Sequence, residues 1–141
     1  MPELPEVEVV KQSLDRKIKF QKIKKVVVRN RNLRFKIPKN FEFFLKNKKI
    51  NKISRKSKYL IFNLNKNTFL IIHLGMTGTI HLNSKKNCRN TNVSFYGSSN
   101  LPVKHNHIII FLENYQFIYN DPRRFGFIKI FKNKNNLDFF F

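Results

Sequence analysis

The sequence predicts a mainly β protein: a two-layer antiparallel β-sandwich (flattened barrel) with an N-terminal α-helix and a short second helix. Many short β-rich runs follow one another at close spacing, each bounded by Asn, Gly or Lys. Only the start of the chain has helical periodicity over several turns. A length of 141 residues fits one domain, and 41% hydrophobic residues suffice for a core.

The predicted N-terminal helix rests on one apolar face. Val7, Val10, Leu14 and Ile18 recur at spacings of three and four, which places them on the same side of a helix. Pro5 suits the first helical turn, where its missing N–H is not needed. We therefore expect this helix to hold the N-terminus of the chain in place.

The remaining elements are predicted from alternating apolar and polar residues and from the turn-forming residues that separate them. Asn40 can cap a short helix that continues through Phe44 and Leu45. The polar stretch 83–106 is typical of loops with one short strand at most. Strands are expected at 22–30, 49–53, 59–64, 68–74, 79–82, 107–112, 116–119 and 127–131.

The charge of the chain favours a polyanionic partner. The sequence has 29 Lys and Arg against 8 Asp and Glu, a formal net charge of +21. Such an excess is typical of a nucleic-acid-binding surface, with an anionic membrane surface as the alternative. Lys, Asn, Ile and Phe are all read from A/T-rich codons, so codon bias accounts for part of the excess.

Cysteine content and apolar runs exclude several classes of protein. The single Cys88 cannot form an intrachain disulfide or supply a thiolate zinc site alone, which predicts a reducing, cytoplasmic setting. The start of the chain carries acids and prolines and is no signal peptide. Apolar runs such as 69–72 are too short to span a bilayer, so we expect no membrane insertion.

The two histidines His105 and His107 could suggest a metal site. Alternating residues of a strand point to opposite faces, and no thiolate cluster lies nearby in the sequence. We therefore expect a local hydrogen-bonding role and no bound metal.

The N-terminus itself can carry chemistry. Methionine is usually removed before a small residue, which would expose Pro2 as a secondary amine with a pKa of about 8. Such an amine can attack a sugar C1′ and form an iminium, a Schiff base. Glu3 lies beside it and could move protons at the sugar ring. Taken alone, Pro-Glu-x-Pro-Glu is more typical of a simple helix start than of a catalytic N-terminus.

Four motifs in order carry a resemblance to a known family. They are 1–8 (MPELPEVE), 54–60 (SRKSKYL), 73–78 (HLGMTG) and 121–126 (DPRRFG). With these motifs the chain resembles the bacterial formamidopyrimidine-DNA glycosylases, enzymes that remove 8-oxoguanine. The resemblance covers 1–131, the N-terminal catalytic domain, and leaves 132–141 as an Asn-, Lys- and Phe-rich tail.

The resemblance implies a catalytic set and a reaction. Pro2 would be the Schiff-base nucleophile, Glu3 the acid at the deoxyribose ring oxygen, and Lys58 a cation near the lesion and its phosphates. The implied activity is base-excision repair: removal of 8-oxoguanine and formamidopyrimidines, followed by β,δ-elimination at the abasic (AP) site. The resemblance implies no cofactor for this chemistry.

The resemblance also implies a DNA-binding set. His73 would contact a phosphate that flanks the lesion. Met76 would fill the hole left by an extruded nucleotide, and Phe125 would wedge between base pairs. Arg123 would hydrogen-bond the orphaned cytosine, and Arg124 would serve phosphate or structure.

The second half of the family's chain has no counterpart in this sequence. That half carries a helix-two-turn-helix module and a zinc finger with four cysteines. We therefore expect no zinc here, and a monomer that binds damaged double-stranded DNA in the bacterial nucleoid, with or without a separately encoded C-terminal half. The alternative is a truncated, catalytically impaired DNA-binding remnant. A small basic RNA-binding protein would explain the charge but not the four motifs.

Overall fold

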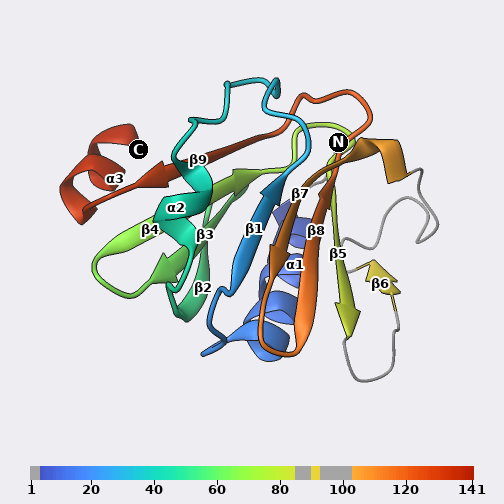
Figure 1. The fold of residues 1–141 in the computed structure, drawn as a ribbon. Coiled ribbons are helices and arrows are strands. Elements are labelled where there is room, and N and C mark those ends of the chain that lie inside the picture. Colours follow the sequence, from blue (N-terminus) through green and yellow to red (C-terminus); the bar gives the residue numbers. More distant parts are fainter. Residues whose placement is uncertain (1–3, 85–89, 93–102) are drawn as a thin grey trace.

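The strands form two antiparallel sheets in the computed structural model, which describes residues 4–84, 90–92 and 103–141 (Figure 1). One sheet has the order β1-β7-β8-β5-β6, from β1 (Lys25–Val28), β7 (Asn106–Phe111), β8 (Tyr115–Asn120), β5 (Thr79–Ser84) and β6 (Asn90–Asn92). The other has the order β2-β3-β4-β9, from β2 (Ile50–Lys56), β3 (Tyr59–Leu64), β4 (Thr68–His73) and β9 (Phe127–Phe131). The predicted two-layer sandwich is confirmed.

The core lies between the two sheets. Phe62 of β3 and Phe117 of β8 meet edge to face across the layers, with ring centroids 5.5 Å apart. Alternate residues such as Leu70 and Ile72 join this core. Strand β4 is also apolar on its other face, because a helix covers it there.

That covering helix is α3 (Lys134–Phe140), in the segment interpreted as a tail from the sequence. Its Leu137 packs into a second apolar cluster with Ile61, Phe69 and Ile71, on the outer face of the four-stranded sheet. The Asn133 side chain caps the helix by accepting a hydrogen bond from the backbone N–H of Asn136, at 2.8 Å. The helix was not predicted, because its stability comes from these distant strands.

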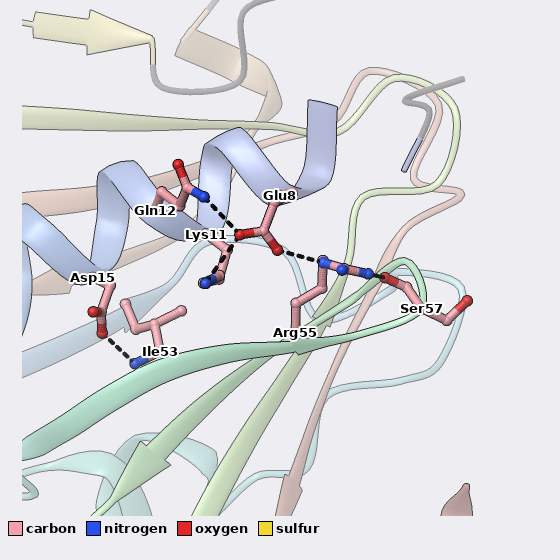
Figure 2. Close-up of polar contacts among 7 residues, drawn as sticks. All are labelled: Glu8, Lys11, Gln12, Asp15, Ile53, Arg55 and Ser57. Carbon is pink, nitrogen blue, oxygen red and sulfur yellow. Dashed lines mark hydrogen bonds and ion pairs between the residues drawn. The ribbon is translucent and has the colours of Figure 1, made fainter. Parts of the chain in front are cut away.

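Helix α1 (Leu4–Ile18) packs against β2, and all four residues of its predicted apolar face are buried. Two polar contacts fix its docking (Figure 2). Glu8 accepts a hydrogen bond from Arg55 Nε at 2.7 Å, and Asp15 accepts one from the backbone N–H of Ile53 at 2.8 Å. The helix is therefore tied to β2 near both of its ends.

Helix α2 (Phe41–Leu45) forms where it was predicted, and Phe41 and Leu45 are buried. The predicted cap is wrong, because the Asn40 side chain makes no capping hydrogen bond. Asn40 has φ −94° and ψ 10°, whereas a capping side chain normally needs an extended backbone. A short 3₁₀ helix, η1 (Val103–His105), precedes β7. Within the described ranges no helix is long and apolar enough to cross a membrane.

Candidate nucleic-acid interface

Two turns of the sandwich touch through their backbones: the β4–β5 turn (74–78) and the β8–β9 turn (121–126). A Cβ at Gly75, where φ is +63°, would lie 2.5 Å from the backbone nitrogen of Gly126. A Cβ at Gly126 would overlap the Tyr119 hydroxyl and the His73 carbonyl oxygen. Both positions therefore need glycine, since any side chain would push the turns apart.

The touching turns expose two large apolar side chains. Met76 on the β4–β5 turn is 45% exposed, and Phe125 on the β8–β9 turn is 48% exposed. Arg123 and Arg124 are exposed on the second turn, and Arg124 has a left-handed φ of 57°. The sequence predicted this presentation of Met76, Arg123 and Phe125. Apolar side chains kept in water beside arginines are typical of a binding surface.

Lys58 and His73 lie next to this surface. His73 is the last residue of β4, and its Cα is paired with that of Tyr59, the residue that follows Lys58. Lys58 itself stands in the two-residue loop between β2 and β3, after Ser57 with φ 52°. The structure thus brings Lys58 of the predicted catalytic set and His73 of the predicted DNA-binding set to neighbouring strand ends.

The ring of His73 is held on three sides. Its Nδ1 accepts a hydrogen bond from the Gly75 N–H at 3.0 Å. The ring stacks on Phe127 with centroids 5.5 Å apart and an interplanar angle of 6°, and it meets Tyr59 at 5.0 Å. Because Nδ1 is an acceptor, a neutral ring carries its proton on Nε2. His73 can therefore donate one oriented hydrogen bond from Nε2.

The charge state of His73 follows from its surroundings. Burial lowers the pKa of His73 below its usual 6.5, and the positive charges of Arg34 and Lys58 lower it further. The neutral form of His73 therefore predominates at pH 7. Arg34, in the loop after β1, was not predicted as part of the site, because that loop has no periodicity or motif that marks it. Lys58 and Arg34 supply the positive charge, and His73 supplies a neutral donor.

The start of α1 is linked to the loop that carries Lys58. Arg55 donates from Nε to Glu8 and from a terminal nitrogen to the Ser57 carbonyl oxygen at 2.8 Å (Figure 2). The hydrogen bond from Arg55, with a second contact from Lys11, lowers the pKa of Glu8 from 4.5 to about 2. The predicted nucleophile Pro2 and acid Glu3 lie outside the described residues. Helix α1, which follows them directly, is fixed beside the Lys58 loop.

A buried carboxylate between the turns was missed from the sequence. Asp121 has no exposed area, and one of its oxygens accepts hydrogen bonds from Tyr119 and from the Gly126 N–H. An acid before proline at the start of a turn motif was the available signal. It indicated a turn and gave no indication of burial.

Of the two histidines considered as metal ligands, His107 has the expected hydrogen-bonding role. His107 is buried in β7, and its Nε2 lies 2.6 Å from the Asp121 carbonyl oxygen, which can only accept. His107 lies in the strand that was predicted at 107–112, and His105, which the sequence placed in the loop stretch 83–106, ends η1. In the part of the chain that the structure describes, no three potential ligand side chains gather at one place.

The fold and these turns define a class: a β-sandwich domain with a basic and apolar surface suited to nucleic acid. Residues 1–128 match the model of the formamidopyrimidine-DNA glycosylase N-terminal domain. The chain belongs to this family.

Relatives and solved structures agree with that assignment. The chain is 43% identical over 141 residues to formamidopyrimidine-DNA glycosylase of Wolbachia pipientis subsp. Culex pipiens, covering 99% of this chain and 47% of the relative. It is 38% identical to that of Bartonella tribocorum, over 91% and 44%. A Lactococcus lactis Fpg complex with abasic-site DNA matches with a TM-score of 0.79 and 30% identity, over 98% and 47%. The chain thus spans about half the length of these relatives.

Proposed function

We propose that this domain serves a base-excision-repair DNA glycosylase that removes 8-oxoguanine and formamidopyrimidines and then cleaves the abasic site. The observation that carries the proposal is the pair of exposed apolar side chains, Met76 and Phe125, on turns that touch each other beside a cationic group. Solved relatives with this fold are complexes with abasic-site DNA and with Fapy-dG DNA, which supports damaged duplex DNA as the partner.

Extrusion of the damaged nucleotide is the first task. Unstacking and unpairing one nucleotide costs a few kcal/mol, and an apolar side chain that enters the stack offsets part of that cost. We assign Met76 to the vacated space and Phe125 to a wedge between neighbouring base pairs. Arg123 has enough donors to satisfy the unpaired cytosine.

Phosphates next to the lesion are the second target. Lys58 and Arg34 act as cations toward the DNA backbone, and the Nε2–H of His73 donates to a phosphate oxygen. Lys58 is half-buried in the loop between β2 and β3. Arg55 holds this loop through its hydrogen bond to the Ser57 carbonyl oxygen. Binding would therefore weaken as salt rises, since each neutralised phosphate releases counterions.

The chemistry begins at the N-terminus. The neutral Pro2 nitrogen attacks C1′, the C1′–base bond breaks, and the base leaves with a proton. Glu3 gives a proton to the ring oxygen as the sugar opens, which leaves an iminium between Pro2 and C1′. The iminium makes the C2′ protons acidic, so that loss of one of them expels the 3′ phosphate. The conjugated iminium that results makes the C4′ proton acidic, and its loss expels the 5′ phosphate. This sequence of steps requires no metal.

Borohydride trapping tests the proposal. The purified chain is mixed with a duplex that holds 8-oxoguanine opposite cytosine, and the mixture is reduced with borohydride. We expect a covalent protein–DNA adduct that Pro2→Gly strongly reduces, while Lys66→Gln, at the opposite end of β4, leaves it unchanged. An absent adduct together with retained, salt-sensitive binding would contradict the enzyme and favour the impaired DNA-binding domain.

A further inference from the structure

The carboxylate of Asp121 lies buried between the two turns and uses both of its oxygens. Oδ2 accepts hydrogen bonds from the Tyr119 hydroxyl at 2.7 Å and from the Gly126 N–H at 2.9 Å. Oδ1 accepts one from the Thr77 hydroxyl at 2.6 Å. We call Thr77, Tyr119, Asp121 and Gly126 the Asp121 cluster.

Thr77 is the member of the Asp121 cluster that joins one turn to the other. It belongs to the β4–β5 turn, directly after Met76, whereas Asp121 and Gly126 belong to the β8–β9 turn. Its hydroxyl donates to Asp121 and also accepts from the Arg123 N–H at 3.3 Å. Among side chains of this size only a hydroxyl both donates and accepts in this way.

The burial of Asp121 makes the link stiff. A carboxylate without contact to water is costly unless hydrogen bonds satisfy its oxygens, and such charge-assisted bonds are stronger than neutral ones. Removal of the Thr77 hydroxyl would leave Oδ1 without the partner that comes from the other turn. The turns would keep their glycine contact and lose the bond that fixes their relative orientation.

We propose that Thr77 and Asp121 are positioning residues that hold the two turns as one unit, so that Met76 and Phe125 enter DNA together. The part of this inference that concerns DNA rests on the proposed function. The link between the turns exists in the free protein and can be tested without DNA. Two experiments therefore separate the inference from the function.

Amide hydrogen exchange of the free chain tests the link. In Thr77→Val, which keeps the shape of the side chain, we expect the Gly126 amide to exchange about tenfold faster, because Asp121 moves more freely. Thr77→Ser keeps the hydroxyl and should exchange like the unmodified chain. Thr68→Val makes the same hydroxyl-to-methyl change at the opposite end of β4, where the Thr68 hydroxyl donates to the Lys66 carbonyl oxygen, and should leave Gly126 unchanged. Equal Gly126 exchange in Thr77→Val and the unmodified chain would overturn the inference.

A double-mutant cycle tests the joint insertion. The probe is a duplex with a tetrahydrofuran abasic analogue opposite cytosine, and binding of Met76→Ala, Phe125→Ala and the double variant is measured by fluorescence anisotropy. If the two side chains enter as a unit, the loss of affinity of the double variant should be about fivefold smaller than the product of the two single losses. When the same variants are made in the Thr77→Val chain, the loss of the double variant should equal that product.

The outcomes of the cycle are distinct. A non-additivity that persists unchanged in Thr77→Val would overturn the coupling through Thr77. Single variants that bind the probe as tightly as the unmodified chain would contradict the proposed function instead. In that case the exchange of Gly126 still decides whether the Asp121 cluster fixes the turns.

Discussion

The two ends of β4 carry similar residue types and are built differently. At one end the β4–β5 and β8–β9 turns expose Met76, Phe125 and arginines, with Lys58 nearby. At the other end Phe20 is 60% exposed, with φ 72°, and the amines of Lys19 and Lys49 lie 5.1 and 5.5 Å from its ring. We call these the turn end and the far end.

What distinguishes the two ends is the layer beneath the surface. The exposed groups of the turn end stand on two required glycines and a buried, hydrogen-bonded carboxylate. At the far end the β3–β4 turn has Lys66 and Asn67, both at left-handed φ, in the open. Charge and exposed aromatics therefore occur at both ends, whereas the buried carboxylate found among the described residues, Asp121, lies at the turn end. We conclude that net charge alone does not locate the site.

The largest expected difference is in stability. Gly75→Ala places a Cβ 2.5 Å from the Gly126 nitrogen at a left-handed φ, so we expect a loss of about 3 kcal/mol or more. At the far end Asn67→Ala, also at a left-handed φ of 57° but in an exposed turn, should cost only about 1 kcal/mol. Urea unfolding of both variants measures the difference, and equal losses would contradict the close contact of the two turns.

The next prediction concerns affinity for DNA. Lys58→Gln should weaken binding to a lesion-containing duplex by about tenfold and reduce the salt slope by about one, as expected for the loss of one phosphate contact. Lys66→Gln removes the same charge at the far end and should change affinity by less than about twofold. Fluorescence anisotropy at several salt concentrations decides between them. Equal losses would mean that the basic surface binds without a defined site.

A smaller effect is expected from the contact that docks α1. Because the pKa of Glu8 is lowered from 4.5 to about 2, its ionised form stabilises the folded chain above pH 4.5. This contribution, about 1 kcal/mol for a partly exposed pair, is lost as the pH falls from about 5 to 2. Urea unfolding of Glu8→Gln should show a deficit at pH 6 that disappears near pH 2. A deficit that stays constant with pH would contradict the ion pair.

The smallest effect concerns His73. Since burial, Arg34 and Lys58 lower the pKa of His73, the neutral ring should predominate as the pH falls from 8 to 6.5. The midpoint of protonation should lie below the usual pKa of 6.5, and protonation disfavours the folded state, since the unfolded chain binds the proton more readily. NMR titration of the His73 ring shifts checks this. A midpoint at or above 6.5 would contradict the neutral Nε2–H donor.

Features with a local signal were predicted from the sequence. The apolar periodicity of α1 and the alternation of the strands define the sandwich, and the glycines around Met76 predict an exposed turn. Strand ends moved by a few residues, as for the first strand, predicted at 22–30 and found at Lys25–Val28. Such features depend on neighbours in the chain, and the sequence displays them directly.

Features that depend on distant contacts were missed. Thr77 and Asp121 are 44 positions apart, and neither residue type indicates that the pair would meet in a buried hydrogen bond. The Asn-rich sequence of helix α3 has no helical periodicity. The helix is stabilised instead by the packing of Leu137 on β3 and β4. Arg34 lies in the loop after β1, whose sequence has no periodicity or motif, and its charge acts on His73. In each case the three-dimensional fold supplies the information that the local sequence lacks.

We propose that Met76 and Phe125, held on two touching turns, open the DNA stack. The most direct measurement is the fluorescence of 2-aminopurine placed next to an 8-oxoguanine in a duplex, because unstacking raises its emission. We expect a rise when the unmodified chain binds, and little rise with the Met76→Ala and Phe125→Ala double variant at the same degree of binding. An equal rise with both proteins would contradict the claim.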